Sequence, residues 1–169
     1  LRNSLKRLQL DYVDIVFAHW PDAETPLEET CKAFSWCIDQ GLAFYWGTSA
    51  FPAETITEIM AICDRLNLHK PIADQCEYHA ITRSILEWDL YNVFDKFKYG
   101  TTTYSPLAGG LLSGKYNDGN FPPGSRYDKD PFSKGFVLQR FVSPENKEKN
   151  FKLLNDIAAL AKELDCSQA

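Results

Sequence analysis

The sequence has no long hydrophobic run and no excess of basic residues. No segment approaches the roughly 18 uninterrupted apolar residues of a membrane-spanning helix, and the first residues do not follow the pattern of a signal peptide. Acidic and basic side chains are interspersed and the formal net charge is −5, so no basic surface is expected for nucleic acid or anionic lipid. We therefore expect neither nucleic-acid binding nor direct insertion into a membrane.

Cysteine pairs of the kind that bind metal or exchange disulfides are also lacking. The five cysteines are odd in number and include no Cys-x-x-Cys pair. We interpret them as reduced, partly buried thiols, which are typical of a cytoplasmic protein. His19, Glu77 and His79 could be imagined as metal ligands, but no His-x-x-x-His or similarly tight spacing is present, so we predict no metal site.

A Gly-x-Gly-x-x-Gly motif is absent, although strand-like and helix-like stretches alternate along the chain. Strand-like segments begin at Val13, Phe44, Ile72 and Thr101, about 30 residues apart. An open doubly wound sheet would normally carry the missing motif after its first strand. We therefore predict a (β/α)8 barrel, of which residues 1–169 form a single partial domain with about strands 4 to 7 and their helices. The chain also begins without an initiator Met, so we expect a fragment that lacks parts of the barrel at both ends.

The pattern predicts where most elements begin and end. Strands are expected over residues 13–18, 43–49, 72–78 and 101–104, and helices over residues 1–8, 54–66 and 85–97. A further helix should begin at Pro26 and end at Gly41. After Pro106, glycines and prolines fill a stretch too long for a simple turn, which indicates a binding loop. We expect the last helix to begin at Ser143, with a serine cap and a proline at its first position.

Polar and aromatic side chains gather where the predicted strands end, which is where functional groups lie in parallel α/β proteins. His19 follows the first strand, and there a histidine can donate a hydrogen bond to a carbonyl oxygen or move a proton. The neighbouring Trp20 could form a wall of the substrate pocket. From its position alone, His19 could equally be a structural histidine in a corner between strand and loop.

Three further residues suit a planar cofactor. Ser49 and Gln75, expected to end successive strands, could pair with its amide, and Tyr104 could stack on its ring. For each residue singly, ordinary hydrogen bonding or core packing is the simpler explanation. Lys115 and Arg126 flank the glycine-rich loop, where backbone N–H groups and two cations could converge on a phosphate. The loop lacks the Walker spacing, so the phosphate signal is weak without the fold.

Five segments, taken in order, resemble the aldo-keto reductases. They are residues 8–22 (LQLDYVDIVFAHWPD), 25–30 (TPLEET), 45–49 (YWGTS), 75–79 (QCEYH) and 104–116 (YSPLAGGLLSGKY). Together they cover almost the whole chain, and the branch that they resemble most closely contains the voltage-gated potassium channel beta subunits. The resemblance implies a (β/α)8 barrel that binds NADPH and passes a hydride to an aldehyde or ketone, with Asp, Tyr, Lys and His as the catalytic set.

The resemblance also implies roles for individual residues. His19 matches the catalytic histidine that orients the substrate carbonyl. Ser49 and Gln75 match the groups that bind the nicotinamide carboxamide, and Tyr104 matches the aromatic residue stacked on the nicotinamide ring. The positions that match the loop around the pyrophosphate and ribose are Ser105, Leu107, Lys115 and Arg126. The family's Asp, Tyr and Lys lie on earlier strands, so we expect residues 1–169 alone to be inactive.

Two departures from the family pattern bear on function. Ala50 stands where the wider family often has Asn and the channel subunits have Arg. The channel subunits read Asn-Arg-Pro-Asp where this chain has His-Trp-Pro-Asp over residues 19–22, which favours a working reductase. We therefore expect a cytoplasmic, NADP-dependent reductase of small carbonyl compounds. The alternative is a beta-subunit-like accessory protein that binds NADPH as a redox sensor and associates with a channel alpha subunit or with copies of itself.

Overall fold

The computed structural model describes residues 1–169, which form two compact units. The first, here called the sheet unit, comprises Leu1–Tyr78 and Arg83–Tyr104. The second, the helical unit, comprises His79–Thr82 and Ser105–Ala169. None of the helices is both long enough and apolar enough to cross a membrane.

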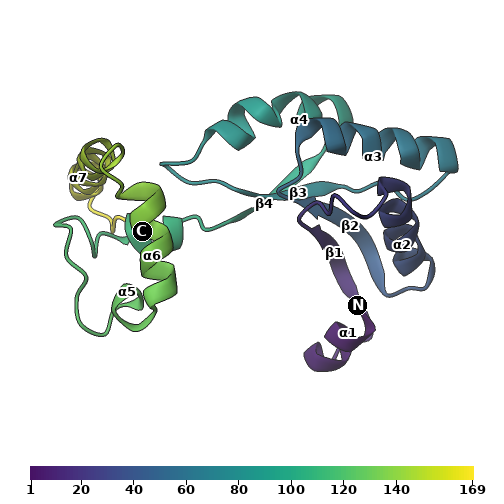
Figure 1. Cartoon of the computed structure of the whole chain (residues 1–169), viewed down its shortest axis with the longest axis horizontal. Coiled ribbons are helices and arrows are strands. Elements are labelled where there is room, and N and C mark those ends of the chain that lie inside the picture. The colour runs from purple at the N-terminus through teal and green to yellow at the C-terminus, as the bar shows by residue number, and fades with distance from the viewer. The chain divides into compact units, whose positions relative to one another are not determined.

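The sheet unit alternates strands with helices, and its four strands are parallel and adjacent in chain order (Figure 1). The strands are β1 (Val13–His19), β2 (Ala43–Ser49), β3 (Ala73–Glu77) and β4 (Gly100–Tyr104). The helices are α1 (Arg2–Leu8), α2 (Leu27–Asp39), α3 (Ala53–Leu66) and α4 (Tyr91–Phe97). The predicted repeat of strand and helix is therefore present, and Gly41, with φ of 66°, follows the end of α2 as expected.

The core of the sheet unit lies on one face of the sheet. Buried strand residues on this face, such as Trp46 and Cys76, share a cluster with apolar residues of α2, α3 and α4. Trp46 stacks on Phe34 with ring centroids 5.0 Å apart, and its Nε1 donates a hydrogen bond to the carbonyl oxygen of His69 over 2.8 Å. Because side chains alternate along a strand, the residues next to these point to the opposite face.

On that opposite face, β2 passes very close to its neighbours at Gly47. A β-carbon at this position would lie 2.6 Å from the carbonyl oxygen of Ala73 and 2.7 Å from the ring of Phe17. Real side chains do not approach backbone oxygens so closely. Glycine is therefore required where the Phe17 ring crosses β2.

The helix predicted over residues 85–97 is interrupted. Ile85–Asp89 form a π-helical turn, η1, and α4 begins only at Tyr91. The N–H of Leu90 donates to the carbonyl oxygen of Ile85, five residues earlier, over 2.9 Å. The extra residue in this turn leaves Trp88 76% exposed and Leu90 only 1% exposed, so the bulge places Leu90 in the core.

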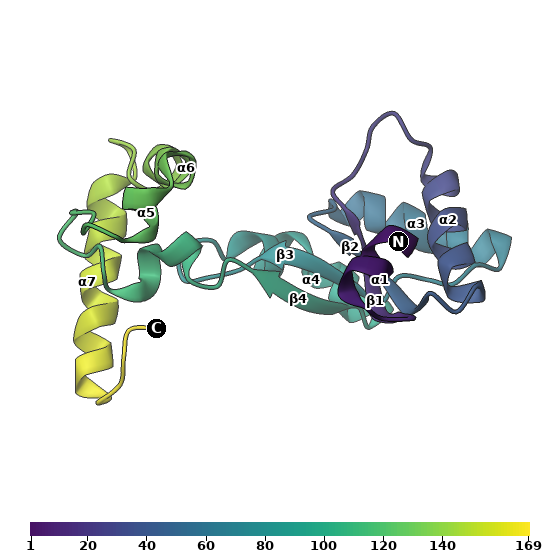
Figure 2. The same cartoon turned by 90° about the horizontal axis from the view of Figure 1, so that it is seen from below.

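The helical unit contains no strand, and its core is a separate apolar cluster that includes Leu111, Tyr127 and Leu154. Its elements are the 3-10 segment η2 (Ala108–Ser113), α5 (Arg126–Lys129), α6 (Pro131–Phe141) and the long α7 (Lys147–Glu163), shown in Figure 2. We predicted no helix between Pro106 and Ser143, which was wrong, because α5 and α6 lie there.

The predicted start of the last helix was also wrong. α7 begins at Lys147, with Asn146 rather than Ser143 at its N-cap. The carbonyl oxygen of Ser143 accepts the N–H groups of Asn146 and Lys147 over 2.9 and 2.8 Å, which closes a separate turn before the helix. A serine followed by a proline therefore initiates a turn here.

Candidate active site

His19, Ser49 and Gln75 lie in one row across three neighbouring strands. His19 is opposite Ser49 in the β1–β2 pair, and Ser49 is opposite Gln75 in the β2–β3 pair. Residues opposite one another in parallel strands project to the same face, and such strands lie about 4.8 Å apart. The row therefore brings an imidazole, a hydroxyl and a carboxamide together on the face of the sheet opposite the helices.

We expected Gln75 to end its strand, but it does not. It is the middle residue of β3. The strand continues to Glu77, which lies opposite Tyr104 at the end of β4. The row itself continues from Gln75 to Thr102. Tyr104 therefore lies two residues beyond the row, because β3 and β4 extend further than β1 and β2.

Hydrogen bonds join the members of the row. The buried Ser49 donates from Oγ to the carbonyl oxygen of Gln75 over 3.1 Å. Gln75 donates from Nε2 to Oγ1 of Thr102 over 3.5 Å, which is a long contact. A hydroxyl and a carboxamide side by side offer both donor and acceptor groups, so this set fits the carboxamide of a nicotinamide ring.

His19 and Trp20 form an exposed pair at the end of β1. Their rings are nearly parallel, with an interplanar angle of 18° and centroids 5.5 Å apart, and Trp20 is 61% exposed. Both line a hollow of about 180 Å³. On its rim, Asp22 accepts hydrogen bonds from Oγ1 of Thr25 over 2.7 Å and from the N–H of Glu24 over 3.0 Å. Both hydrogen bonds lower the pKa of Asp22, and the bond from Thr25 has the larger effect.

Three strand ends are followed by residues in the left-handed conformation. They are Trp20, Ala50 and Ser105, with φ of 64°, 56° and 53°, directly after β1, β2 and β4. A residue other than glycine held in this conformation costs of order 1 kcal/mol, and such residues concentrate at functional sites. The strain supports this edge of the sheet as the active site. None of these three residues is a glycine, so nothing in the sequence indicated the left-handed conformation.

A buried carboxylate beside the row was missed by the sequence analysis. Asp74 has no exposed surface, and its oxygens accept hydrogen bonds from Thr48 Oγ1 at 2.6 Å and from the N–H groups of Ala50 and Phe51, both at 3.3 Å. The hydroxyl groups of Thr48 and Tyr99 are 2.9 Å apart. Burial raises the pKa of both Asp74 and Tyr99. An acidic residue directly before Gln75 in a predicted strand was the available signal.

The other predicted cofactor residues belong to the helical unit, where a compact turn holds the start of the loop. The carbonyl oxygen of Ser105 accepts the N–H of Ala108 over 2.7 Å, and that of Leu107 accepts the N–H of Gly110 over 2.8 Å. Gly109 and Gly110 adopt φ of 70° and 116°, which glycine tolerates best.

The two predicted cations of this loop are both exposed. Arg126 donates from Nη1 to the carbonyl oxygen of Gly109 and from Nη2 to Oγ of Ser133, both over 3.3 Å, so its guanidinium is tied to the glycine turn. Lys115 follows η2 by two residues. Exposed cations beside turning backbone suit a phosphate group.

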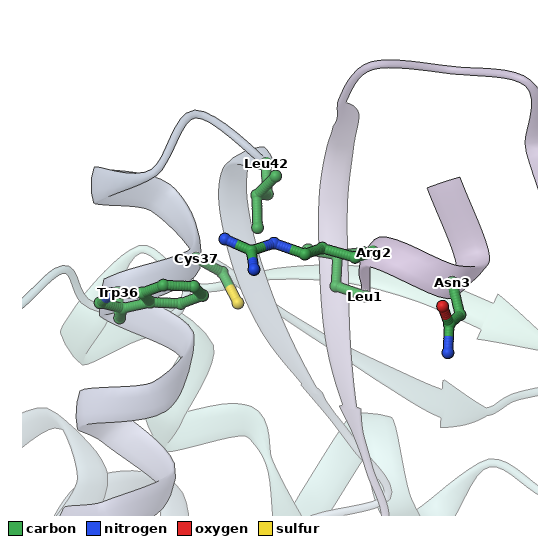
Figure 3. Close-up of a pocket in the computed structure, with 6 residues that line it drawn as sticks. All are labelled: Leu1, Arg2, Asn3, Trp36, Cys37 and Leu42. Atoms are coloured by element: carbon green, nitrogen blue, oxygen red, sulfur yellow. The ribbon is translucent and has the colours of Figure 1, made fainter. Parts of the chain in front are cut away.

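A further hollow, of about 310 Å³, lies between α1 and α2 and contains none of the predicted site residues. Figure 3 shows Arg2 reaching from α1 toward Trp36, while Asn3 points away. The guanidinium carbon of Arg2 is 5.4 Å from the centre of the Trp36 ring. The hollow adjoins Leu42, just before β2, and so lies at the opposite end of that strand from Ser49.

Comparison with known proteins gives a consistent result. The family model described as the aldo/keto reductase family matches residues 1–169. A protein of Oryza sativa subsp. japonica named a probable voltage-gated potassium channel subunit beta is 42% identical, over 100% of this chain and 50% of its own length. A protein of the same name from Arabidopsis thaliana is 49% identical, over 73% of this chain and 38% of its own length. The chain thus spans half or less of these curated relatives.

A solved structure agrees with the fold. The glycerol dehydrogenase AKR11B4 from Gluconobacter oxydans superposes with a TM-score of 0.74 at 26% identity, over 99% of this chain and 46% of that protein. The prediction of an incomplete (β/α)8 barrel is confirmed by this match and by the four-stranded parallel sheet. The resemblance to the family, and to its channel-subunit branch, is confirmed by the family match and the two plant relatives.

Proposed function

Because the chain belongs to the aldo/keto reductase family, we propose that the full-length protein transfers a hydride between NADPH and the carbonyl carbon of a small aldehyde or ketone. The observation that carries the proposal is the row of His19, Ser49 and Gln75, which sets a proton-donating ring beside two groups that suit a carboxamide. Family membership alone would not specify these side chains.

Each site residue has a role in this proposal. His19 donates a hydrogen bond to the substrate carbonyl oxygen and so stabilises the negative charge that develops there. Trp20, parallel to His19, forms a wall for the substrate. Ser49 and Gln75 hold the nicotinamide carboxamide, and Tyr104 contacts its ring. NADPH, when bound, supplies the hydride. The residues proposed for its pyrophosphate and ribose are Ser105, Leu107, Lys115 and Arg126.

The test uses full-length protein, with NADPH binding followed by cofactor fluorescence and turnover measured on a panel of aldehydes and ketones. We expect His19→Ala to lower kcat/KM roughly a hundredfold or more while NADPH affinity stays unchanged. The matched control is His69→Ala, because His69 is an exposed histidine of the same unit whose ring lies 3.0 Å from Asp39. A full-length protein that neither binds NADPH nor reduces any of these carbonyl compounds would contradict the proposal.

We also propose that residues 1–169 alone do not reduce carbonyl compounds. The proposal is supported by the family resemblance, in which the Asp, Tyr and Lys of the catalytic set come from strands earlier than β1. In addition, β1 and β4 each have only one neighbouring strand, and unpaired edges favour aggregation. Cofactor-dependent aldehyde reduction by the purified 169 residues would show this proposal to be wrong.

A second candidate function is a channel accessory protein that binds NADPH as a redox sensor and turns over slowly. It is favoured by the names of the two plant relatives, both probable voltage-gated potassium channel beta subunits. The His-Trp pair at residues 19 and 20 favours the reductase instead. Co-purification with a channel alpha subunit, together with negligible aldehyde turnover, would select the accessory function.

A cytoplasmic location belongs to the same proposal. All five cysteines are free, and Cys31, Cys63 and Cys76 are buried, as in proteins kept reduced. Cell fractionation with antibody detection should find the protein with cytoplasmic markers. Recovery from an oxidising compartment would contradict this location.

A further inference from the structure

We propose that Asp74 is a positioning residue for the cofactor site. Its buried carboxylate fixes the turn that follows Ser49, and that turn fixes Ser49 beside Gln75. The inference rests on the proposed function, since the contact of Ser49 and Gln75 with the nicotinamide carboxamide is part of it. Asp74 itself touches neither cofactor nor substrate.

The first step of the argument is where the carboxylate is held. Asp74 lies opposite Thr48 in the β2–β3 pair, directly before Gln75, and its side chain is fully buried. Thr48 donates to Asp74 Oδ2 over 2.6 Å. Because the Thr48 oxygen also lies 2.9 Å from the hydroxyl of Tyr99, the carboxylate is fixed from the side of the helices.

The second step is what the carboxylate holds. Its Oδ1 accepts the N–H of Ala50, and its Oδ2 accepts the N–H of Phe51, each over 3.3 Å. The Ala50 N–H also donates to the carbonyl oxygen of Gln75 over 3.1 Å. One side chain therefore binds two successive N–H groups immediately after Ser49, and at Ala50 it does so where the backbone is in the strained left-handed conformation.

The third step distinguishes positioning from ordinary stabilisation. The hydrogen-bond partners of Asp74 are one hydroxyl and two backbone N–H groups, with no cation among them. Burying a carboxylate in this way opposes folding, and burial correspondingly raises its pKa. An apolar residue would serve the core better, whereas two adjacent acceptor oxygens are what the turn after Ser49 requires.

The test is Asp74→Asn in the full-length protein, because asparagine keeps the size and one acceptor oxygen but loses the second. We expect the Kd for NADPH to rise about tenfold, with the KM for the carbonyl substrate unchanged. Hydrogen exchange at the amides of Ala50 and Phe51 should become faster. If the role of Asp74 is purely structural, the substitution should instead lower the unfolding temperature and change the KM values for cofactor and carbonyl substrate by similar factors.

Asp64→Asn is the matched control, because Asp64 is a carboxylate of the same unit in an exposed ion pair with Lys70. It should leave NADPH affinity and exchange at residues 50 and 51 unchanged. If Asp74→Asn does not fold, Thr48→Val takes its place, since it removes one donor to the carboxylate and keeps the shape of the side chain. That variant should weaken NADPH binding about threefold.

The outcomes separate this inference from the proposed function. Wild-type protein that binds no NADPH would overturn the proposed function and the inference with it. If wild-type protein binds NADPH and folded Asp74→Asn binds it equally well, the inference alone is overturned. Wild-type affinity in Thr48→Val, when Asp74→Asn cannot be obtained, overturns it as well.

Discussion

The sheet unit and the helical unit hold their backbones by different means. In the sheet unit, parallel strands pair residue by residue, and a core that includes Trp46, Phe51 and the isoleucines of α3 packs behind them. In the helical unit no strand is present, and the rings of Tyr116, Phe121 and Tyr127 pack together at centroid distances of 4.6 to 5.7 Å. Single residues with special conformations, such as Gly109, shape its loop.

This difference between the two units suggests which unit can supply residues for the reacting centre and which can supply residues for binding a charged group. Strand pairing sets His19 and Ser49 in a fixed lateral relation, which suits groups that must meet one reacting centre. In the helical unit, Lys115 lies in the loop and Arg126 begins the short helix α5, and both have exposed side chains, which suits the binding of a charged group. Three pairs of substitutions test how far this contrast extends.

The largest effect should come from the core of the sheet unit. Trp46→Ala removes a fully buried ring together with its stacking on Phe34 and its hydrogen bond, and we expect a loss of about 3–5 kcal/mol of unfolding free energy. Hydrogen exchange in the full-length protein, read segment by segment, should show the loss in β2 and α2.

The counterpart in the helical unit is Leu154→Ala, which empties a buried position of α7 and should cost about 2–5 kcal/mol. Its loss should appear in α7 and η2. If either substitution speeds exchange equally in both units, they unfold as one body, and the contrast drawn above does not hold for stability.

A smaller effect is expected at two glycines of opposite character. Gly47→Ala would press a methyl group against the carbonyl oxygen of Ala73 and the ring of Phe17, so we expect a loss of about 1–3 kcal/mol. Gly135→Ala, within α6, meets nothing within 4 Å and should stabilise the helical unit by about 0.5–1 kcal/mol. Urea unfolding of both variants measures this difference, and the same sign for both would show that close strand packing is not what requires Gly47.

The smallest effect is a pH dependence of opposite sign in the two units. Asp130 caps α6, and hydrogen bonds from Ser133 lower its pKa below the ordinary value of 3.8. A lowered folded-state pKa means that its stabilising contribution is present above pH 3.8 and is lost as pH falls through the lower value. For Asp74, burial raises the pKa, so the corresponding contribution is present at low pH and is lost as pH rises through the raised value.

The measurement compares wild-type protein with Asp130→Asn and with Asp74→Asn between about pH 2.5 and 7, by urea unfolding. The stability difference from wild type should grow with pH for Asp130→Asn and shrink with pH for Asp74→Asn. The groups that face these carboxyls are Arg126 near Asp130, and Tyr99 and Cys76 near Asp74. Parallel pH profiles for both variants would remove this part of the contrast.

Much of the sheet unit could be predicted from the sequence, because buried strands and amphipathic helices leave periodic patterns. β2 was predicted with its observed bounds and α3 within one residue at its start. The interruption at η1 was not predicted, because the sequence from Ile85 to Phe97 is compatible with one continuous helix. α6 was missed because its aromatic residues do not form a buried stripe: Phe132 is 84% exposed, even though Asp130 and Pro131 form a recognisable helix start.

The candidate site was predicted in its residue types but not in its geometry. The sequence indicated His19, Ser49 and Gln75, but lateral register depends on how whole strands align, so it could not show that they share a row. Asp74 escaped notice because β3 also contains Gln75 and Glu77, and the sequence alone does not show that Asp74 is fully buried. The roles assigned to the site residues stay predictions until the variants are measured.

The unequal length of the strands gives the sheet a step at the edge that carries the candidate site. Tyr104 lies two residues beyond the row, a rise of about 6.6 Å at 3.3 Å per residue. The site therefore has a lower and an upper level. A flat ring placed on the lower level would meet polar groups along its rim and the phenol of Tyr104 above them. A single rigid sheet could therefore contact both the edge and the face of such a ring, without any segment closing over the ring.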